Sequence, residues 1–245
     1  MSKYYRVYAD VDLDAIRANC IELMSKTEPS TKALAVVKAD GYGHGDVAVS
    51  KAVRDLVYGY AVATLDEAVN LRENGINKPI LILGYVEPEE YEALVKNEID
   101  ATVFDYETAK ALNDVALRLG KVAFCHIKVD TGMSRLGYLC DGDYFENGVE
   151  GICEGCSLPG LNAEGIFTHF AVSDEPGEQC RAYTKHQFRL FTDVIKQVEE
   201  RLGKRFVIRH CANTGAVARY PETYLDMVRP GLLLYGYGEF AEELN

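Results

Sequence analysis

Short apolar runs rich in β-branched residues alternate along the chain with longer stretches in which apolar residues recur every three or four positions. Runs of the first kind predict strands, and the helical period of the second kind predicts amphipathic helices. The strands predicted in this way are 33–38, 60–64, 79–84, 101–104, 122–129, 163–169, 206–211 and 226–235. Strands that alternate with helices are typical of α/β proteins with a parallel sheet.

Helical stretches between these strands include residues 66–74, 89–97, 106–119 and 183–202. Gly75, Gly120 and Gly203 follow three of them, where a left-handed helix cap needs glycine. A further helix, capped by Asp12 or Asp14, opens the series. Eight strands, their crossovers and this opening helix favour a closed (β/α)₈ TIM barrel. The alternative is an open doubly wound sheet, but the sequence lacks that fold's Gly-rich fingerprint after the first strand.

The charge and cysteine content narrow the classes of function. The chain has 245 residues and a formal net charge of −12, which argues against nucleic acid or an anionic membrane as a partner. We find no apolar run long enough for a membrane span and no signal peptide. Seven cysteines in a chain of this size indicate reduced thiols and a cytoplasmic location. Cys153 and Cys156 form a CxxC pair without the partners of a zinc site, so we expect no metal.

Reactive side chains of a barrel gather where its strands end. Lys38 ends the first predicted strand and is a candidate Schiff-base amine, although a lysine that reaches solvent is the alternative. The fifth strand brings Lys128, Asp130 and then Arg135, whose guanidinium suits a substrate carboxylate. An ion pair of Asp130 with either cation is the alternative there. His169 ends the sixth strand, where a buried histidine bonded to a carbonyl is the alternative.

The ends of the last two strands suggest a phosphate site. Asn213, Thr214 and Gly215 lead from the seventh strand into a short helix and offer N–H groups and a hydroxyl, and Arg229 lies on the eighth strand. Barrels most often hold a phosphate at the loops after strands seven and eight. A phosphate there and an amine on the first strand indicate a phosphorylated aldehyde as cofactor, namely pyridoxal 5'-phosphate (PLP).

Five motifs resemble those of bacterial alanine racemases and occur in the family's order. They are residues 35–45 (AVVKADGYGHG), 128–137 (KVDTGMSRLG), 165–170 (GIFTHF), 212–214 (ANT) and 229–236 (RPGLLLYG). The resemblance covers essentially the whole chain. It implies a PLP-dependent isomerase that interconverts L- and D-alanine for peptidoglycan synthesis in the bacterial cytoplasm.

The resemblance also implies a role for each matching residue. Lys38 would hold the cofactor and serve as one of two racemisation bases. Arg135 would orient the substrate, and Lys128 matches a lysine that is commonly carbamylated and then steadies this arginine. Arg229 would face the pyridine nitrogen, and His169 would belong to the hydrogen-bond network beside it. The remaining cofactor-binding positions, which include the phosphate site, would be Tyr42, Asn213, Thr214, Gly231 and Leu232.

In this family the second base is a tyrosine from a C-terminal β-domain, which the other subunit of a homodimer contributes. We therefore expect residues 12–236 to form the PLP-binding barrel. We expect residues 1–11, with a leading strand over 4–11, to join that β-domain, and residues 237–245 to begin it. On this expectation the chain alone racemises alanine feebly. The alternatives are a single-domain PLP-binding protein of cofactor homeostasis and the barrel of a serine racemase.

Overall fold

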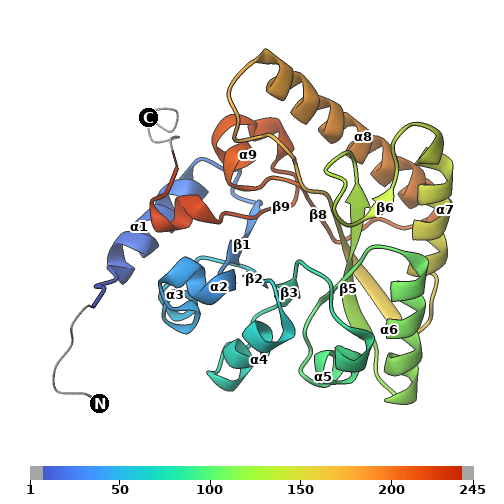
Figure 1. Ribbon diagram of the computed structural model, residues 1–245, viewed down its shortest axis with the longest axis horizontal. Coiled ribbons are helices and arrows are strands. Elements are labelled where there is room, and N and C mark those ends of the chain that lie inside the picture. Colours follow the sequence, from blue (N-terminus) through green and yellow to red (C-terminus); the bar gives the residue numbers. More distant parts are fainter. Residues whose placement is uncertain (1–7, 239–245) are drawn as a thin grey trace.

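Eight parallel strands form a closed barrel in the computed structural model, which describes residues 8–238 (Figure 1). In chain order they are β1 (Lys32–Val36), β2 (Gly59–Val62), β3 (Ile80–Ile82), β4 (Ala101–Val103), β5 (Ala123–Asp130), β7 (Leu161–Phe167), β8 (Ile208–His210) and β9 (Met227–Val228). Ladders join them in the orders β3-β2-β1-β9 and β4-β5-β7-β8. The short strand β6 (Tyr138–Leu139) pairs with β5 outside this circle.

Backbone hydrogen bonds close the barrel between the two ladders. Asp100 joins β3 to β4, because its carbonyl accepts from the N–H of Ile82 (3.0 Å) and its N–H donates to Ile80 (2.8 Å). On the other side, the N–H of Arg229 donates to the carbonyl of Ala212 over 2.9 Å and joins β9 to the end of β8. The predicted (β/α)₈ barrel is therefore confirmed.

Helices surround the strands (Figure 1). They are α1 (Leu13–Ser25), α2 (Lys38–Gly43), α3 (Asp46–Ala52), α4 (Leu65–Glu73), α5 (Tyr91–Lys96), α6 (Tyr106–Arg118), α7 (Phe145–Cys156), α8 (Glu178–Leu202) and α9 (Thr214–Arg219). Short 3₁₀ helices cover Pro88–Glu90, Gly142–Tyr144, Pro221–Thr223 and Leu232–Tyr235. Asp12 caps α1 by accepting from the N–H of Ala15 (2.9 Å), which agrees with one of the two predicted caps. Gly75, Gly120 and Gly203 have positive φ after α4, α6 and α8, as predicted.

Apolar side chains form one core between the strands and the helices and a second, smaller core that includes alternate residues of β1. Since strand residues of a barrel point alternately outward and inward, the smaller core lies in the lumen. In β5, Cys125, Ile127 and Val129 belong to the outer core. The residues between and after them, which are His126, Lys128 and Asp130, therefore face the lumen. This alternation places a column of polar side chains inside the barrel.

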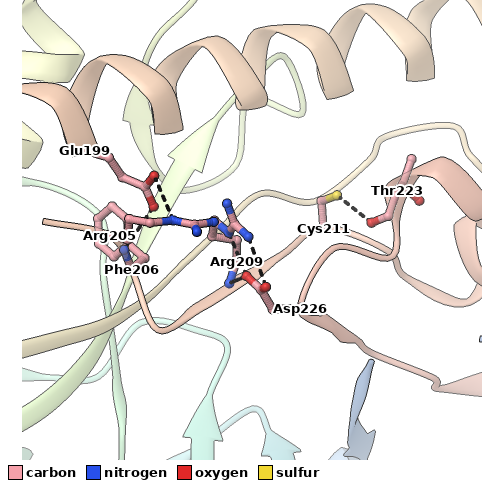
Figure 2. Close-up of polar contacts among 7 residues, drawn as sticks. All are labelled: Glu199, Arg205, Phe206, Arg209, Cys211, Thr223 and Asp226. Carbon is pink, nitrogen blue, oxygen red and sulfur yellow. Dashed lines mark hydrogen bonds and ion pairs between the residues drawn. The ribbon is translucent and has the colours of Figure 1, made fainter. Parts of the chain in front are cut away.

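Side-chain bonds hold β8 in register (Figure 2). Arg209 binds the carboxylate of Asp226 through its backbone N–H (2.8 Å), Nε (2.7 Å) and Nη2 (3.1 Å). The thiol of Cys211 donates to the carbonyl of Thr223 over 3.1 Å, and Glu199 of α8 accepts from the backbone N–H of a residue just before the strand. These contacts fix the strand end that leads into the predicted phosphate loop.

Seven of the eight predicted strands run past the observed strand end at the barrel mouth, so that His169 follows β7 instead of ending it. The predicted strand 226–235 is regular only over Met227–Val228, because Pro230 has no N–H to continue a ladder and a 3₁₀ helix follows it. The first strand ends at Val36, and Lys38 begins α2 instead of ending the strand. Of the predicted leading strand 4–11, residues 8–11 have no regular structure and the rest lies outside the described residues, as does 239–245.

Within residues 8–238, no helix is long and apolar enough to cross a bilayer. The seven cysteines all lie in this range and are free thiols. Cys153 and Cys156 are both on α7. Over the same part of the chain, His, Cys, Asp and Glu side chains nowhere gather in a group of three or more that could hold a metal ion.

Candidate active site

A cavity of about 210 Å³ lies at the C-terminal end of the strands. The predicted site residues in its wall are Lys38, Tyr42, His169, Asn213, Thr214, Arg229, Gly231 and Leu232. Val36, Leu83 and Asp174 also contribute to the wall, and the sequence did not single them out. A larger cavity near Arg72 and Phe124 lies at the other end of the barrel, away from these groups.

Lys38 and Tyr42 reach the cavity through an unusual turn after β1. Ala39, Asp40, Gly41 and Tyr42 all lie in the left-handed region, with φ between 52° and 60°. Each non-glycine residue there costs about 1–2 kcal/mol, so the surroundings must hold the turn in place. Asp40 contributes through its carbonyl, which accepts from the N–H of Gly45 over 2.8 Å. The turn brings the Lys38 amine to 5.9 Å from the centre of the Tyr42 ring.

Hydroxyl groups converge on Gly231 and form a small cradle. The N–H of Gly231 donates to Oγ1 of Thr214 over 3.0 Å. A Cβ atom at Gly231 would lie 3.1 Å from the Tyr42 hydroxyl and 3.4 Å from the Thr214 hydroxyl, so glycine keeps this space open. Burial raises the pKa of Tyr42, which keeps its hydroxyl a donor at neutral pH. Asn213 caps the adjacent helix by accepting from the N–H of Ala216 (3.2 Å).

The guanidinium of Arg229 is buried in the barrel and bonds only to neutral partners among the described residues. Its side chain is 2% exposed. Nη2 donates to the carbonyls of Thr168 (2.9 Å) and Cys211 (3.2 Å), and Nη1 donates to Nδ1 of His210 (3.0 Å). Burial lowers the pKa of Arg229 to about 10, so the group keeps its charge at neutral pH.

Two buried histidines form a hydrogen-bonded chain that leads from Arg229 into the lumen of the barrel. Nε2 of His210 lies 2.8 Å from Nδ1 of His126. Because a guanidinium can only donate, Nδ1 of His210 must accept, and its proton is on Nε2. That proton bonds His126, whose own proton is therefore on Nε2. Burial lowers the pKa of both rings, that of His126 to about 3, so both are neutral.

Neither His126 nor His210 was singled out in the sequence, so their contact was not predicted. Period-two alternation in the fifth strand, His126-Ile127-Lys128-Val129-Asp130, is the pattern that could have placed His126 in the lumen.

Lys128 lies beside the cavity, at the next inward position of β5. It is 4% exposed, and its amine lies 4.4 Å from the centre of the Phe167 ring. Burial lowers the pKa of this lysine well below its usual value, and the charges of Arg229 and Arg135 lower it further. These effects favour the uncharged form of the amine, whereas the carboxylate of Asp130 acts in the opposite direction.

Arg135 is exposed in the loop after β5 and does not line the cavity. The carboxylate of Asp130 accepts from the backbone N–H groups of Gly132 (2.9 Å) and Ser134 (3.0 Å). Among the residues that the structure describes, it forms no ion pair with Arg135 or Lys128. Asp130 thus shapes the loop that carries Arg135.

His169 lies among the basic side chains of the site. Its ring lies between Nη2 of Arg229 (3.4 Å from Nδ1) and the amide of Asn213 (3.5 Å from Nε2). Burial lowers its pKa well below the usual value, and four nearby basic side chains lower it further; they are Arg229, Lys128, Arg135 and Lys38. A chain of net charge −12 thus concentrates positive charge at this end of the barrel, which attracts anions.

A (β/α)₈ barrel with a lysine after its first strand and a hydroxyl-lined glycine after its last has the features of a PLP-dependent barrel domain. Residues 11–239 match the family described as alanine racemase, N-terminal domain. The alanine racemase of Desulforamulus reducens is 43% identical over 231 residues, which are 94% of this chain and 60% of that protein. The chain therefore belongs to the alanine racemase family, as its motifs predicted.

Solved structures agree with this assignment. An alanine racemase of Clostridium difficile 630 has a TM-score of 0.89 and 37% identity, over 95% of this chain and 60% of that one. The structure of alanine racemase from Bacillus anthracis with bound L-Ala-P has a TM-score of 0.83 and 31% identity, over 97% and 61% of the two chains. The present chain spans about 60% of the length of the curated relatives that it matches.

Proposed function

We propose that the chain is the PLP-binding barrel of an alanine racemase, and that the whole protein interconverts L- and D-alanine. The observation that carries this proposal is the single cavity that joins Lys38, the Tyr42–Thr214–Gly231 cradle and Arg229. An amine, a hydroxyl-lined space and a fixed guanidinium are the groups that an aldehyde, a phosphate and a pyridine nitrogen require. The residues present therefore fit PLP.

Lys38 provides the amine in this cavity. When bound, PLP supplies an electron-withdrawing ring that acidifies the Cα–H bond of an attached amino acid. Nζ of Lys38 then takes the proton from Cα, or returns it, on one face of the substrate. Tyr42 and Thr214 donate hydrogen bonds at the cradle and fix the distance of the phosphate from this amine.

Arg229 determines how strongly the ring withdraws electrons. It would donate a hydrogen bond to the ring nitrogen, and because it keeps its own charge it would oppose protonation of that nitrogen. By keeping that nitrogen unprotonated, Arg229 would make the ring a weaker electron sink, and the proton would return to Cα rather than to another atom. This arrangement favours racemisation over transamination.

The substrate carboxylate binds Arg135, in the loop after β5. Arg135 is exposed and extends from a loop that Asp130 shapes, so it is free to bind and orient a carboxylate. Two solved relatives support alanine-like ligands, since the Bacillus anthracis protein has bound L-Ala-P and a Clostridium difficile protein is in complex with cycloserine.

The test uses the 245-residue chain with PLP. Borohydride reduction followed by peptide mass mapping should place the cofactor on Lys38, with Lys38→Ala as the variant and Lys51→Ala, an exposed lysine of α3, as the control. Alanine in deuterated water should then exchange its Cα proton in one enantiomer, as followed by proton NMR. Serine provides the comparison substrate.

Loss of both signals in Lys38→Ala alone would support the proposal. Cofactor scattered over surface lysines, with the same exchange in Lys38→Ala as in the parent chain, would overturn it.

A further inference from the structure

Gln187 is a buried polar residue on α8 whose amide contacts two loops of the site. Its side chain has no exposed surface. Oε1 accepts from the backbone N–H of Ala171 over 3.0 Å. Nε2 lies 3.3 Å from Oγ1 of Thr131, in the loop that carries Arg135, and 3.4 Å from the carbonyl of His169. One amide thus spans the chain segments that follow β5 and β7.

The hydroxyl bonds around Gln187 have a fixed direction. Oγ1 of Thr168 donates to the carbonyl of Val129 (2.9 Å), so the 2.8 Å contact between the two threonine hydroxyls must be donated by Thr131. Having donated its proton, Thr131 can only accept from Nε2 of Gln187. The backbone carbonyl of Thr168 also accepts from Arg229 (2.9 Å). Gln187 is therefore the outer end of a buried network that reaches this guanidinium.

Tyr183, one helical turn before Gln187, also contacts the loop after β5. Its hydroxyl donates to the carbonyl of Gly132 over 2.8 Å. A Cβ atom at Gly132 would lie 2.3 Å from this hydroxyl, so the residue must be glycine for the tyrosine to approach. Asp130 accepts from the N–H of the same residue. Side chains therefore hold both the N–H and the carbonyl of Gly132, three residues before Arg135.

We propose that Gln187, assisted by Tyr183, is a positioning residue that fixes Arg135 and His169 relative to each other. The proposal rests on the proposed function, because that function gives these two residues their roles. A buried amide costs about 1–3 kcal/mol when its bonds are incomplete, whereas leucine or methionine would fill the same space between helix and barrel without that penalty. Gln187 offers what an apolar side chain cannot, namely bonds to both segments at once.

The first measurement is hydrogen exchange of the whole chain without ligand, read by mass spectrometry. In Gln187→Leu we expect amides of residues 131–137 and 168–173 to exchange about tenfold faster, because two or three hydrogen bonds are lost locally. The control is Val198→Ala, a fully buried residue on the same helix, which weakens the core without touching either loop. Unchanged exchange in both segments, or the same increase in Val198→Ala, would overturn the proposal.

Tyr183→Phe keeps the ring and removes only the hydroxyl, so it decides the question for residues 131–137 if Gln187→Leu fails to fold. In the deuterium exchange assay with PLP, both variants should raise the alanine concentration for half-maximal rate several-fold while cofactor labelling of Lys38 stays unchanged. If no protein exchanges alanine, the proposed function fails, and the ligand-free measurement still decides whether Gln187 clamps the two loops.

Discussion

The guanidinium of Arg229 and the imidazole of His210 share a buried hydrogen bond of 3.0 Å in which the arginine can only donate. The imidazole also stacks on Phe167, with ring centres 4.8 Å apart and an angle of 12° between the planes. His210 therefore serves both as the acceptor for a charged group and as part of the packing of the lumen. These two contributions can be separated by substitution.

His210→Phe keeps a ring of similar size against Phe167 and removes the acceptor. The Nη1 group of Arg229 then lacks its partner in a buried setting, so we expect the free energy of unfolding to fall by about 1–3 kcal/mol. Urea denaturation at neutral pH measures the change. His186→Gln, at a partly exposed position on α8, is the control and should change stability by less than about 0.5 kcal/mol. Equal stability of His210→Phe and the parent chain would contradict the role given to this bond.

Acid should destabilise the barrel through its buried histidines. Burial lowers the pKa values of His126, His169 and His210 in the folded state. The unfolded chain then binds more protons below its ordinary histidine pKa of about 6.5, so stability is complete above that pH and is lost below it. Burial acts oppositely on Asp100, whose pKa is raised to about 7, so that this residue favours the folded state as the pH falls.

The three histidines together change the free energy of unfolding more than this one carboxyl group does. Between about pH 6 and about pH 4.5 we expect stability to fall by about 1–3 kcal/mol per pH unit, measured by urea unfolding at several pH values. His126→Gln should reduce the slope, whereas His186→Gln, which alters a histidine outside the core, should leave it unchanged. A flat profile in the parent chain would show that the histidines are not held neutral.

The barrel could be predicted from sequence because its strands and helices have distinct periods, but some local structure could not. α7 was not predicted, since Gly148, Gly151 and Gly155 make its sequence a poor helix former. The structure explains them by close packing: a Cβ atom at Gly148 would lie 2.4 Å from the sulfur of Cys140, and one at Gly155 would lie 2.9 Å from the hydroxyl of Tyr138. Tertiary contact overrides helix propensity here.

Some residues of the site were predicted from the sequence and others were not, for a related reason. Resemblance named Lys38, Tyr42 and Arg229, because they lie in motifs. It gave no indication of Gln187, which lies in the middle of a long helix, where a polar residue is ordinarily on the surface. Nor could periodicity reveal the left-handed turn after β1, since three of its four residues are not glycine and such a turn depends on the contacts around it.

The space above Gly231 is predicted to control cofactor affinity. Alanine at this position adds a methyl group on the side of the backbone that faces the cradle. That methyl would lie 3.1 Å from the Tyr42 hydroxyl and fill the cradle. Gly231→Ala should therefore weaken PLP binding about tenfold, as measured by absorbance titration, with circular dichroism to check the fold. Thr214→Val, which loses a hydroxyl but adds no obstruction at Gly231, is the comparison. Equal affinity of Gly231→Ala and the parent chain would place the phosphate elsewhere.

Lys128 is predicted to react with carbon dioxide. Burial, Arg229 and Arg135 all lower the pKa of its amine, which favours the uncharged form, and an uncharged amine adds to carbon dioxide to give a carbamate and one released proton. The product is an anion beside two arginines, whose charges stabilise it. The chain in ¹³C-labelled bicarbonate should show a carbamate carbon resonance that Lys128→Ala lacks and that Lys121→Ala, an exposed control lysine, retains. In Arg135→Ala the resonance should weaken, since one of the two stabilising charges is removed. A resonance of the same intensity in all variants would come from surface amines and would refute the assignment.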